Sequence, residues 1–279
     1  MGIYDNYDYV TSGLTQHFDG EFNGGLGHVS ATRVWKDLVG NSDANLSEEV
    51  RWTRNSAMFS GQPSIITFDS IVTNRYTIMV TFNPVYLTGQ THSRMFGENP
   101  FPTLFTHTTS SRAYGFYAQG KDQTFPGLTI PEQGQVNHAA IRFTGTHVQL
   151  FVNGVFDSEI ATSTNPPLTT VTATMGNRVS GAARQFSGKI HNFMVYDRNL
   201  SDGEILNNAE IDLERFGEDP LGRSVQLKNE NEHIFPLVKG EDLIGFIPTI
   251  GNLDDLKTSD ISNVVSAINE IVTRLEALE

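Results

Sequence analysis

The stretch FSGKIHNFMVYDRNLSDGEILNNAEIDLERFG (186–217) decides the fold of most of this chain. Its first part, 186–197, is rich in β-branched and aromatic residues and predicts a strand. The remainder predicts a helix, because Ser201 is a good N-cap and Glu204 follows at the capping-box spacing. Apolar residues then recur at helical intervals: Ile205, Leu206, Ala209, Leu213 and Phe216. Gly217 is placed to end the helix.

Further strands are predicted upstream of this stretch, each bounded by turn residues. They lie in SIITFDSI (64–71), YTIMVTFNPV (76–85), RAYGFYAQG (112–120), HAAIRFTG (138–145), HVQLFVNGVF (147–156) and TTVTATMG (169–176). The pair Asn153-Gly154 between two β runs predicts a tight hairpin. Because no amphipathic helix separates these strands, we expect an all-β fold: a two-sheet antiparallel jelly-roll sandwich closed by one short helix.

The sequence predicts three parts: a β-sandwich over 1–217, a connector with short β segments over 218–252, and a coiled coil over 253–279. The last part has apolar residues at alternating spacings of three and four: Ile261, Val264, Ile268, Ile271, Leu275 and Leu278. This a/d seam needs partner helices, and branched residues at both positions favour three strands over two. We therefore expect a homotrimer. The alternative is a helix that docks on the β domain of its own chain.

Composition excludes several classes of function. The net charge is −13, with 32 acidic and 19 basic residues, which disfavours nucleic-acid binding. The chain has no cysteine, so disulfides and thiolate metal sites are excluded, as is typical of a protein folded in a reducing cytoplasm. The first residues, MGIYDNYDYV (1–10), indicate no signal peptide. No apolar run is long enough to span a membrane.

Several segments resemble the laminin-G/concanavalin-A-like jelly roll in the form common in bacteriophage structural proteins. They are SGLTQHFDGEFNGGLGH (12–28), RVWKDLVGN (33–41), FVNGVFDS (151–158) and, above all, 186–217. TSDISNVVSAINEI (258–271) is similar to the short trimerising segments of phage fibres and baseplates.

This resemblance implies a homotrimeric virion appendage: a tail fibre, baseplate or head fibre protein. Its location would be the virion, after synthesis in the host cytoplasm. Its partners would be other virion proteins and host cell-wall or surface polysaccharide. The leading hypothesis is non-enzymatic glycan binding or particle decoration. The alternatives are a structural adaptor or spacer that docks another virion protein, and a glycan-cleaving hydrolase. Fold alone does not decide between them.

The segment Glu210-Ile211-Asp212-Leu213-Glu214 resembles the E-x-D-x-E motif of concanavalin-like β-glucanases. In that family the motif lies on a strand, whose period of two brings the carboxylates to one face. Here the surrounding sequence is helical, so the three carboxylates diverge. We therefore expect these side chains on a solvated helix face, no catalytic residue, and no enzyme activity.

Glycan binding needs aromatic faces and planar polar groups. The segment THTTSSRAYGFY (106–117) is the best local supply, and its candidate carbohydrate-binding residues are His107, Arg112, Tyr114 and Tyr117. The alternative is a strand with one core face and one ordinary surface face. Trp35 and Trp52 are expected to be packing residues.

No cofactor is expected, with calcium as the one open possibility. Asp19, Glu21 and Asn23 stand at alternate positions of FDGEFNGG (18–25) and are candidate calcium ligands, because oxygen donors suit this ion. The alternative is a polar turn in which these side chains bond the backbone. The eight histidines show no zinc-site spacing.

Overall fold

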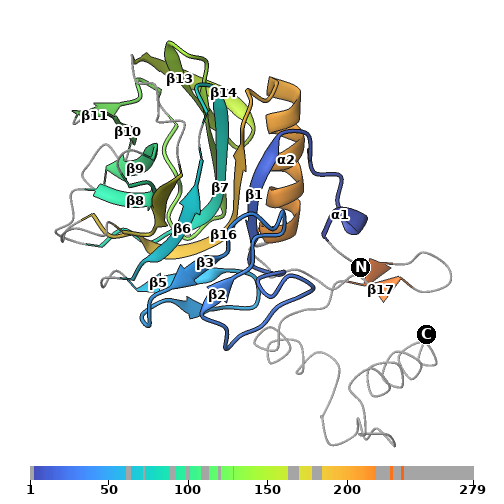
Figure 1. The fold of residues 1–279 in the computed structure, drawn as a ribbon. Coiled ribbons are helices and arrows are strands. Elements are labelled where there is room, and N and C mark those ends of the chain that lie inside the picture. The colour runs from blue at the N-terminus through green and yellow to red at the C-terminus, as the bar shows by residue number, and fades with distance from the viewer. Residues whose placement is uncertain are drawn as a thin grey trace, which may run out of the picture. The chain divides into compact units, whose positions relative to one another are not determined.

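The computed structural model describes residues 3–217 apart from 61–63, 72, 88–91, 99–100, 108–112, 119–120, 128, 163–169 and 178–183. Residues 1–217 form one compact unit (Figure 1). In the second unit, 218–279, the structure describes two short antiparallel strands, β17 (Leu227–Lys228) and β18 (Ile234–Phe235). The predicted coiled-coil seam from Ile261 to Leu278 lies outside the described residues, so trimerisation stays a prediction.

The first sheet has the order β14-β13-β12-β7-β16-β5-β4, with β1 also paired to β16. All of its pairings are antiparallel. Its strands are β1 (Leu14–Asp19), β4 (Arg51–Trp52), β5 (Ala57–Ser60), β7 (Tyr76–Pro84), β12 (Asn137–Phe143), β13 (His147–Val152), β14 (Val155–Ala161) and β16 (Ser187–Tyr196). The long strand β16 pairs with β7 on one side, and with β5 and then β1 on the other.

The second sheet has the order β11-β10-β9-β8-β15-β6-β3-β2 and is also antiparallel. Its strands are β2 (Val34–Trp35), β3 (Ala44–Leu46), β6 (Ile66–Ser70), β8 (His92–Phe96), β9 (Thr103–His107), β10 (Tyr114–Ala118), β11 (Lys121–Thr124) and β15 (Val171–Met175). Together the two sheets confirm the predicted antiparallel sandwich.

The hairpin between β13 and β14 forms as predicted. Asn153 and Gly154 have φ values of 50° and 84°, which is the left-handed region that a tight two-residue turn requires. Asn153 also fixes the neighbouring strand, because its side-chain oxygen accepts a hydrogen bond from the His138 N–H at 2.9 Å.

The core between the sheets is built from aromatic side chains. The Phe68 ring on β6 lies 5.2 Å from the Phe18 ring on β1 and 5.5 Å from the Phe193 ring on β16. Trp35 is fully buried as expected, 5.9 Å from Phe18, and Trp52 packs against the same core. Edge-to-face contacts of this kind add to the hydrophobic free energy of burial.

Helix α2 (Asp202–Phe216) covers the outer face of the first sheet (Figure 1). The predicted capping box is present: the Ser201 side chain accepts from the Glu204 N–H, and the Glu204 side chain accepts from the Ser201 N–H. The helix ends at Gly217 as predicted, but with φ of −54° rather than a left-handed conformation. The short helix α1 (Ile3–Asn6) belongs to the N-terminal segment that packs on the same face. No helix in the described part of the chain is long and apolar enough to cross a membrane.

Candidate functional site

A buried polar network joins α2 to the first sheet. The Asp212 carboxylate accepts hydrogen bonds from the Tyr9 hydroxyl at 2.5 Å, from Asn192 Nδ2 at 2.8 Å and from the Thr81 hydroxyl. Burial raises the pKa of Asp212, while these hydrogen bonds act in the opposite direction. The network therefore fixes the helix and the N-terminal segment against β7 and β16.

The position of Asp212 corrects one expectation. The E-x-D-x-E segment is helical, as predicted, and Glu210 and Glu214 are exposed. Asp212 does not point into solvent, however, and is completely buried. It lies on the face of α2 that also carries Ile205, Ala209 and Phe216, so it is part of the packing surface. These carboxylates cannot flank a sugar together.

Arg215 is the cation of this network. Its Nη1 lies 2.6 Å from Asp19 Oδ2, and its Nη2 lies 2.8 Å from Glu21 Oε2. Its guanidinium also stacks 4.4 Å from the centre of the Tyr7 ring. Burial raises the pKa of the Asp19 carboxyl, and the neighbouring guanidinium opposes that shift.

The candidate calcium ligands have other partners in the structure. Asp19 and Glu21 are paired with Arg215, and Asp19 Oδ1 also accepts the Glu21 N–H at 2.9 Å. The Asn23 side chain bonds the N–H and the carbonyl of Val29. The polar-turn alternative therefore describes this segment. Among the described residues, no three His, Cys, Asp or Glu side chains are grouped so as to hold a metal ion.

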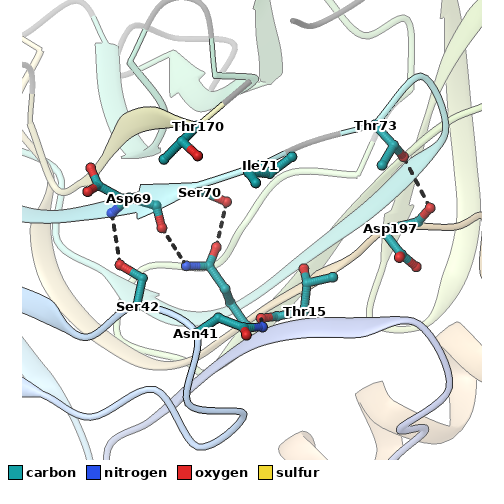
Figure 2. Close-up of a pocket in the computed structure, with 10 residues that line it drawn as sticks. Thr15, Asn41, Ser42, Asp69, Ser70, Ile71, Thr73, Thr170 and Asp197 are labelled. Atoms are coloured by element: carbon teal, nitrogen blue, oxygen red, sulfur yellow. Dashed lines mark hydrogen bonds between the residues drawn. The ribbon is translucent and has the colours of Figure 1, made fainter. Parts of the chain in front are cut away.

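A pocket of about 590 Å³ opens between β1 of the first sheet and the end of β6 of the second sheet (Figure 2). Nine of its ten lining residues carry polar side chains. The hydroxyl groups come from Thr15, Ser42, Ser70, Thr73 and Thr170, the amides from Gln16 and Asn41, and the carboxylates from Asp69 and Asp197. Ile71, half exposed, is the apolar member. None of the ten is basic or aromatic.

Gln16 connects the two sheets at this pocket. Its Nε2 donates to the Asp69 carbonyl at 2.8 Å, and its Oε1 accepts from the Ser70 hydroxyl. Both hydrogen bonds are drawn in Figure 2. Asp69 is held further, because its N–H donates to Ser42 Oγ at 3.3 Å and its Oδ1 accepts from Thr172 Oγ1 at 3.2 Å. The Asp69 carboxylate is therefore exposed but held at a defined position.

The loop that follows β2 forms another wall of the pocket, and Asp37 holds this loop in place. The Asp37 carboxylate accepts four backbone N–H groups, those of His17, Val39, Asn41 and Ser42, at 2.9 to 3.1 Å. Asn41 Nδ2 then donates to the Thr15 carbonyl at 2.6 Å. The loop is thus ordered before any ligand arrives, which lowers the entropic cost of binding.

The third wall is formed by the turn after β6 and the end of β16. The Thr73 hydroxyl donates to the Asp197 carbonyl at 3.1 Å, as Figure 2 shows. The Asp197 N–H donates to the Gly13 carbonyl at 2.9 Å. Residues with polar side chains therefore surround the pocket, and two of them are acidic, although apolar atoms contribute the greater part of its exposed surface.

The predicted carbohydrate-binding residues that the structure describes do not line this pocket. Tyr114 is in the core, 1% exposed, so its ring cannot stack on a sugar, and that prediction is wrong. His107 and Tyr117 are half-buried on the outer face of the second sheet, where His107 Nε2 lies 3.0 Å from Thr124 Oγ1. Arg112 lies outside the described residues.

Comparison with protein families matches residues 59–206 to the model described as the concanavalin A-like lectin/glucanases superfamily. The chain belongs to this family. The match covers more than half of the 279 residues and includes most strands of both sheets. A comparison with curated protein sequences found no match.

Solved structures show the same fold at low sequence identity. A Trypanosoma rangeli sialidase is 18% identical with a TM-score of 0.55, over 75% of this chain and 34% of the sialidase. The chain therefore spans about a third of that enzyme's length. Domain 4 of AbnA, an extracellular arabinanase from Geobacillus stearothermophilus, is 16% identical with a TM-score of 0.55, over 70% of this chain and 98% of that domain. This superfamily fold is shared with parts of glycoside hydrolases.

Proposed function

We propose that the β-sandwich binds a carbohydrate of the host surface in the polar pocket and does not cleave it. The observation that supports this most directly is the lining of that pocket, to which both sheets contribute residues with hydroxyl, amide and carboxylate side chains. Such groups exchange hydrogen bonds with the hydroxyls of a sugar. The arabinanase domain of the same fold was solved in complex with arabinotriose, which is consistent with this role.

The buried carboxylates under α2 cannot supply the catalytic pair of a glycosidase. A retaining glycosidase needs two carboxylates that flank the substrate closely, and an inverting one needs a somewhat wider pair. Asp19 and Asp212 are completely buried and already hydrogen-bonded. Neither can reach a sugar without the network under α2 opening.

Because the described lining residues include no aromatic ring for stacking, a single site binds weakly. In this proposal the seam from Ile261 to Leu278 joins three chains, so that several weak sites act together through effective concentration. The trimer would be an appendage of a phage particle, a tail fibre, baseplate or head fibre, and would be located in the virion. The support is the sequence pattern and the resemblance of 258–271 to phage trimerising segments.

A structural adaptor is the second candidate. It is favoured by three exposed apolar side chains, Val155 and Phe156 on β14 and Leu206 on α2. Phe156 and Leu206 lie on the same face of the first sheet, since the Phe156 ring contacts Phe151 in the cluster under α2 and Gly154 lies directly against Leu206. An adaptor would use such a patch to dock another virion protein and would show no glycan binding.

The test is a glycan array with the full-length protein, followed by titration of each hit. Thr170 is exposed and lines the pocket, so Thr170→Trp should fill the pocket mouth and weaken binding by about tenfold or more. Thr146→Trp, exposed outside the lining, is the matched control and should bind like the parent.

Two results would contradict the proposal. Unchanged binding by Thr170→Trp would place the site elsewhere, and release of reducing sugar from a bound glycan would show an enzyme. Light scattering tests the assembly separately. The full chain should be a trimer, and Ile268→Asp should break it, because three carboxylates would meet on an apolar axis.

A further inference from the structure

The charge of the pocket lining restricts which sugars fit. Its two ionisable residues, Asp69 and Asp197, both carry carboxylates, and none of the lining residues that the structure describes is Lys, Arg or His. A sugar that carries its own carboxylate, such as a sialic or uronic acid, is normally held by a cation or by a bidentate Arg. This lining offers no such group.

Of the basic residues close in sequence to the lining, Arg75 is exposed two residues after Thr73, whereas Arg198 and Lys36 are engaged elsewhere. Arg198 follows Asp197 directly, but its guanidinium contacts the Ser12 carbonyl and both carboxylate oxygens of Glu204. Lys36, next to the loop wall, forms an ion pair with Asp43 at 2.6 Å. Neither cation compensates the two acidic side chains of the pocket.

The net charge of the whole chain, −13, also disfavours anionic ligands. A negative potential lowers the local concentration of anionic ligands and slows their association. Neutral sugars are unaffected by this potential. Their hydroxyl groups can donate hydrogen bonds to Asp69 and Asp197, and hydrogen bonds to an ionised acceptor are stronger than those to a neutral one.

We infer that the pocket selects neutral, hydroxyl-rich glycans and rejects sugars that carry a carboxylate. This inference rests on the proposed function, because it names the ligand class of the same pocket. Asp69 and Asp197 are the specificity-determining residues. Each carboxylate accepts hydrogen bonds from the hydroxyl groups of a neutral sugar and repels the carboxylate of an acidic sugar.

The experiment compares neutral and acidic probes by titration calorimetry on the full-length protein. The neutral probes are arabinotriose, cellotriose and lactose. The acidic probes are cellotriose oxidised to a carboxylate at its primary alcohols, and sialyllactose. We expect at least one neutral probe to bind about tenfold or more tightly than its acidic counterpart, with the difference shrinking as ionic strength rises from about 0.02 M to about 0.5 M.

The decisive variant is Asp69→Asn/Asp197→Asn, which keeps the shape of the pocket and removes both charges. The preference for the neutral probe should fall by about tenfold. Glu159→Gln/Glu210→Gln is the matched control, since it removes two exposed carboxylates outside the lining and should leave the preference unchanged.

The experiment distinguishes a failure of this inference from a failure of the proposed function. If the acidic probe binds as tightly as the neutral one and Thr170→Trp abolishes both, the inference is wrong and the proposed function stands. A preference that survives in Asp69→Asn/Asp197→Asn would also overturn the inference, because the selection would then come from other groups. If no probe binds, the proposed function fails and the inference fails with it.

Discussion

The Ser70 hydroxyl on β6 donates a hydrogen bond to Gln16 Oε1 on β1, and this pair joins the two sheets at the wall of the pocket. Both side chains are buried. Gln16 also donates to the Asp69 carbonyl at 2.8 Å. One amide therefore sets both the spacing of the sheets and the position of an acidic residue in the lining.

Replacing Gln16 by Ala should affect stability and binding together. The Ser70 hydroxyl and the Asp69 carbonyl would lose a buried partner, at a cost of about 1–3 kcal/mol in the free energy of unfolding. Glycan affinity should fall by about tenfold, because Asp69 loses its support. Denaturant unfolding and calorimetric titration measure the two effects. Gln149→Ala, on the first sheet outside the lining, is the control and should keep full affinity.

Asp37→Asn should weaken binding although Asp37 is not among the lining residues. The carboxylate accepts four backbone N–H groups, whereas an amide offers one oxygen and turns an NH₂ group towards the other donors. We expect a loss of about 1–3 kcal/mol in stability and a lower glycan affinity. Asp43→Asn in the same loop removes a half-exposed ion pair with Lys36 but keeps the Oδ1 that accepts the Asp37 N–H, and should cost less than about 1 kcal/mol. Equal effects of the two variants would show that Asp37 does not organise the loop.

Arg215→Met should be the most destabilising of these substitutions. It would leave the buried carboxylate of Asp19 without its cation, which costs about 3–5 kcal/mol in the free energy of unfolding. Lys36→Met breaks a solvent-exposed pair of similar length and should cost less than about 1 kcal/mol. Urea unfolding of both variants checks this. A loss for Arg215→Met no larger than for Lys36→Met would refute a structural role for the network.

Stability should fall in mild acid because of His138. This side chain is completely buried, neither ring nitrogen has a hydrogen-bond partner among the described residues, and burial lowers its pKa from 6.5 to about 3. The unfolded chain therefore takes up the proton first, so stability is lost as the pH falls below 6.5 towards 3. Because the His138 pKa differs between the folded and unfolded chain, the free energy of unfolding should fall by about 2 kcal/mol between pH 7 and pH 5. In His138→Leu that part of the pH dependence should disappear, and identical slopes for both proteins would contradict the assignment.

Local sequence patterns predicted the central strands and the closing helix, because alternation and caps depend on neighbouring residues. Strands β1 to β5, β8, β9 and β11 were not predicted. For β2, β3 and β4 the reason is their length, since two or three residues cannot show a period. The burial of Asp212 could have been recognised, because it falls on the helical face of Ile205, Ala209 and Phe216. Its partners could not, since Tyr9 and Thr81 reach it only through the tertiary fold.

No local sequence pattern indicated the pocket. Its residues come from separate segments between Thr15 and Asp197, and each is a common polar side chain in a strand end or turn. The segment around Tyr114 attracted the prediction because aromatic and basic residues are dense there. In the sandwich, side chains alternate between the two faces of each strand. This places Tyr114 in the core and His107 and Tyr117 on the outer face.

The most direct test of the central claim is a crystal structure of the full chain with the neutral oligosaccharide that binds it most tightly. The account predicts a sugar in the pocket between β1 and β6, with its hydroxyl groups on Asp69 and Asp197. A sugar bound instead at His107 and Tyr117, on the outer face of the second sheet, would contradict it.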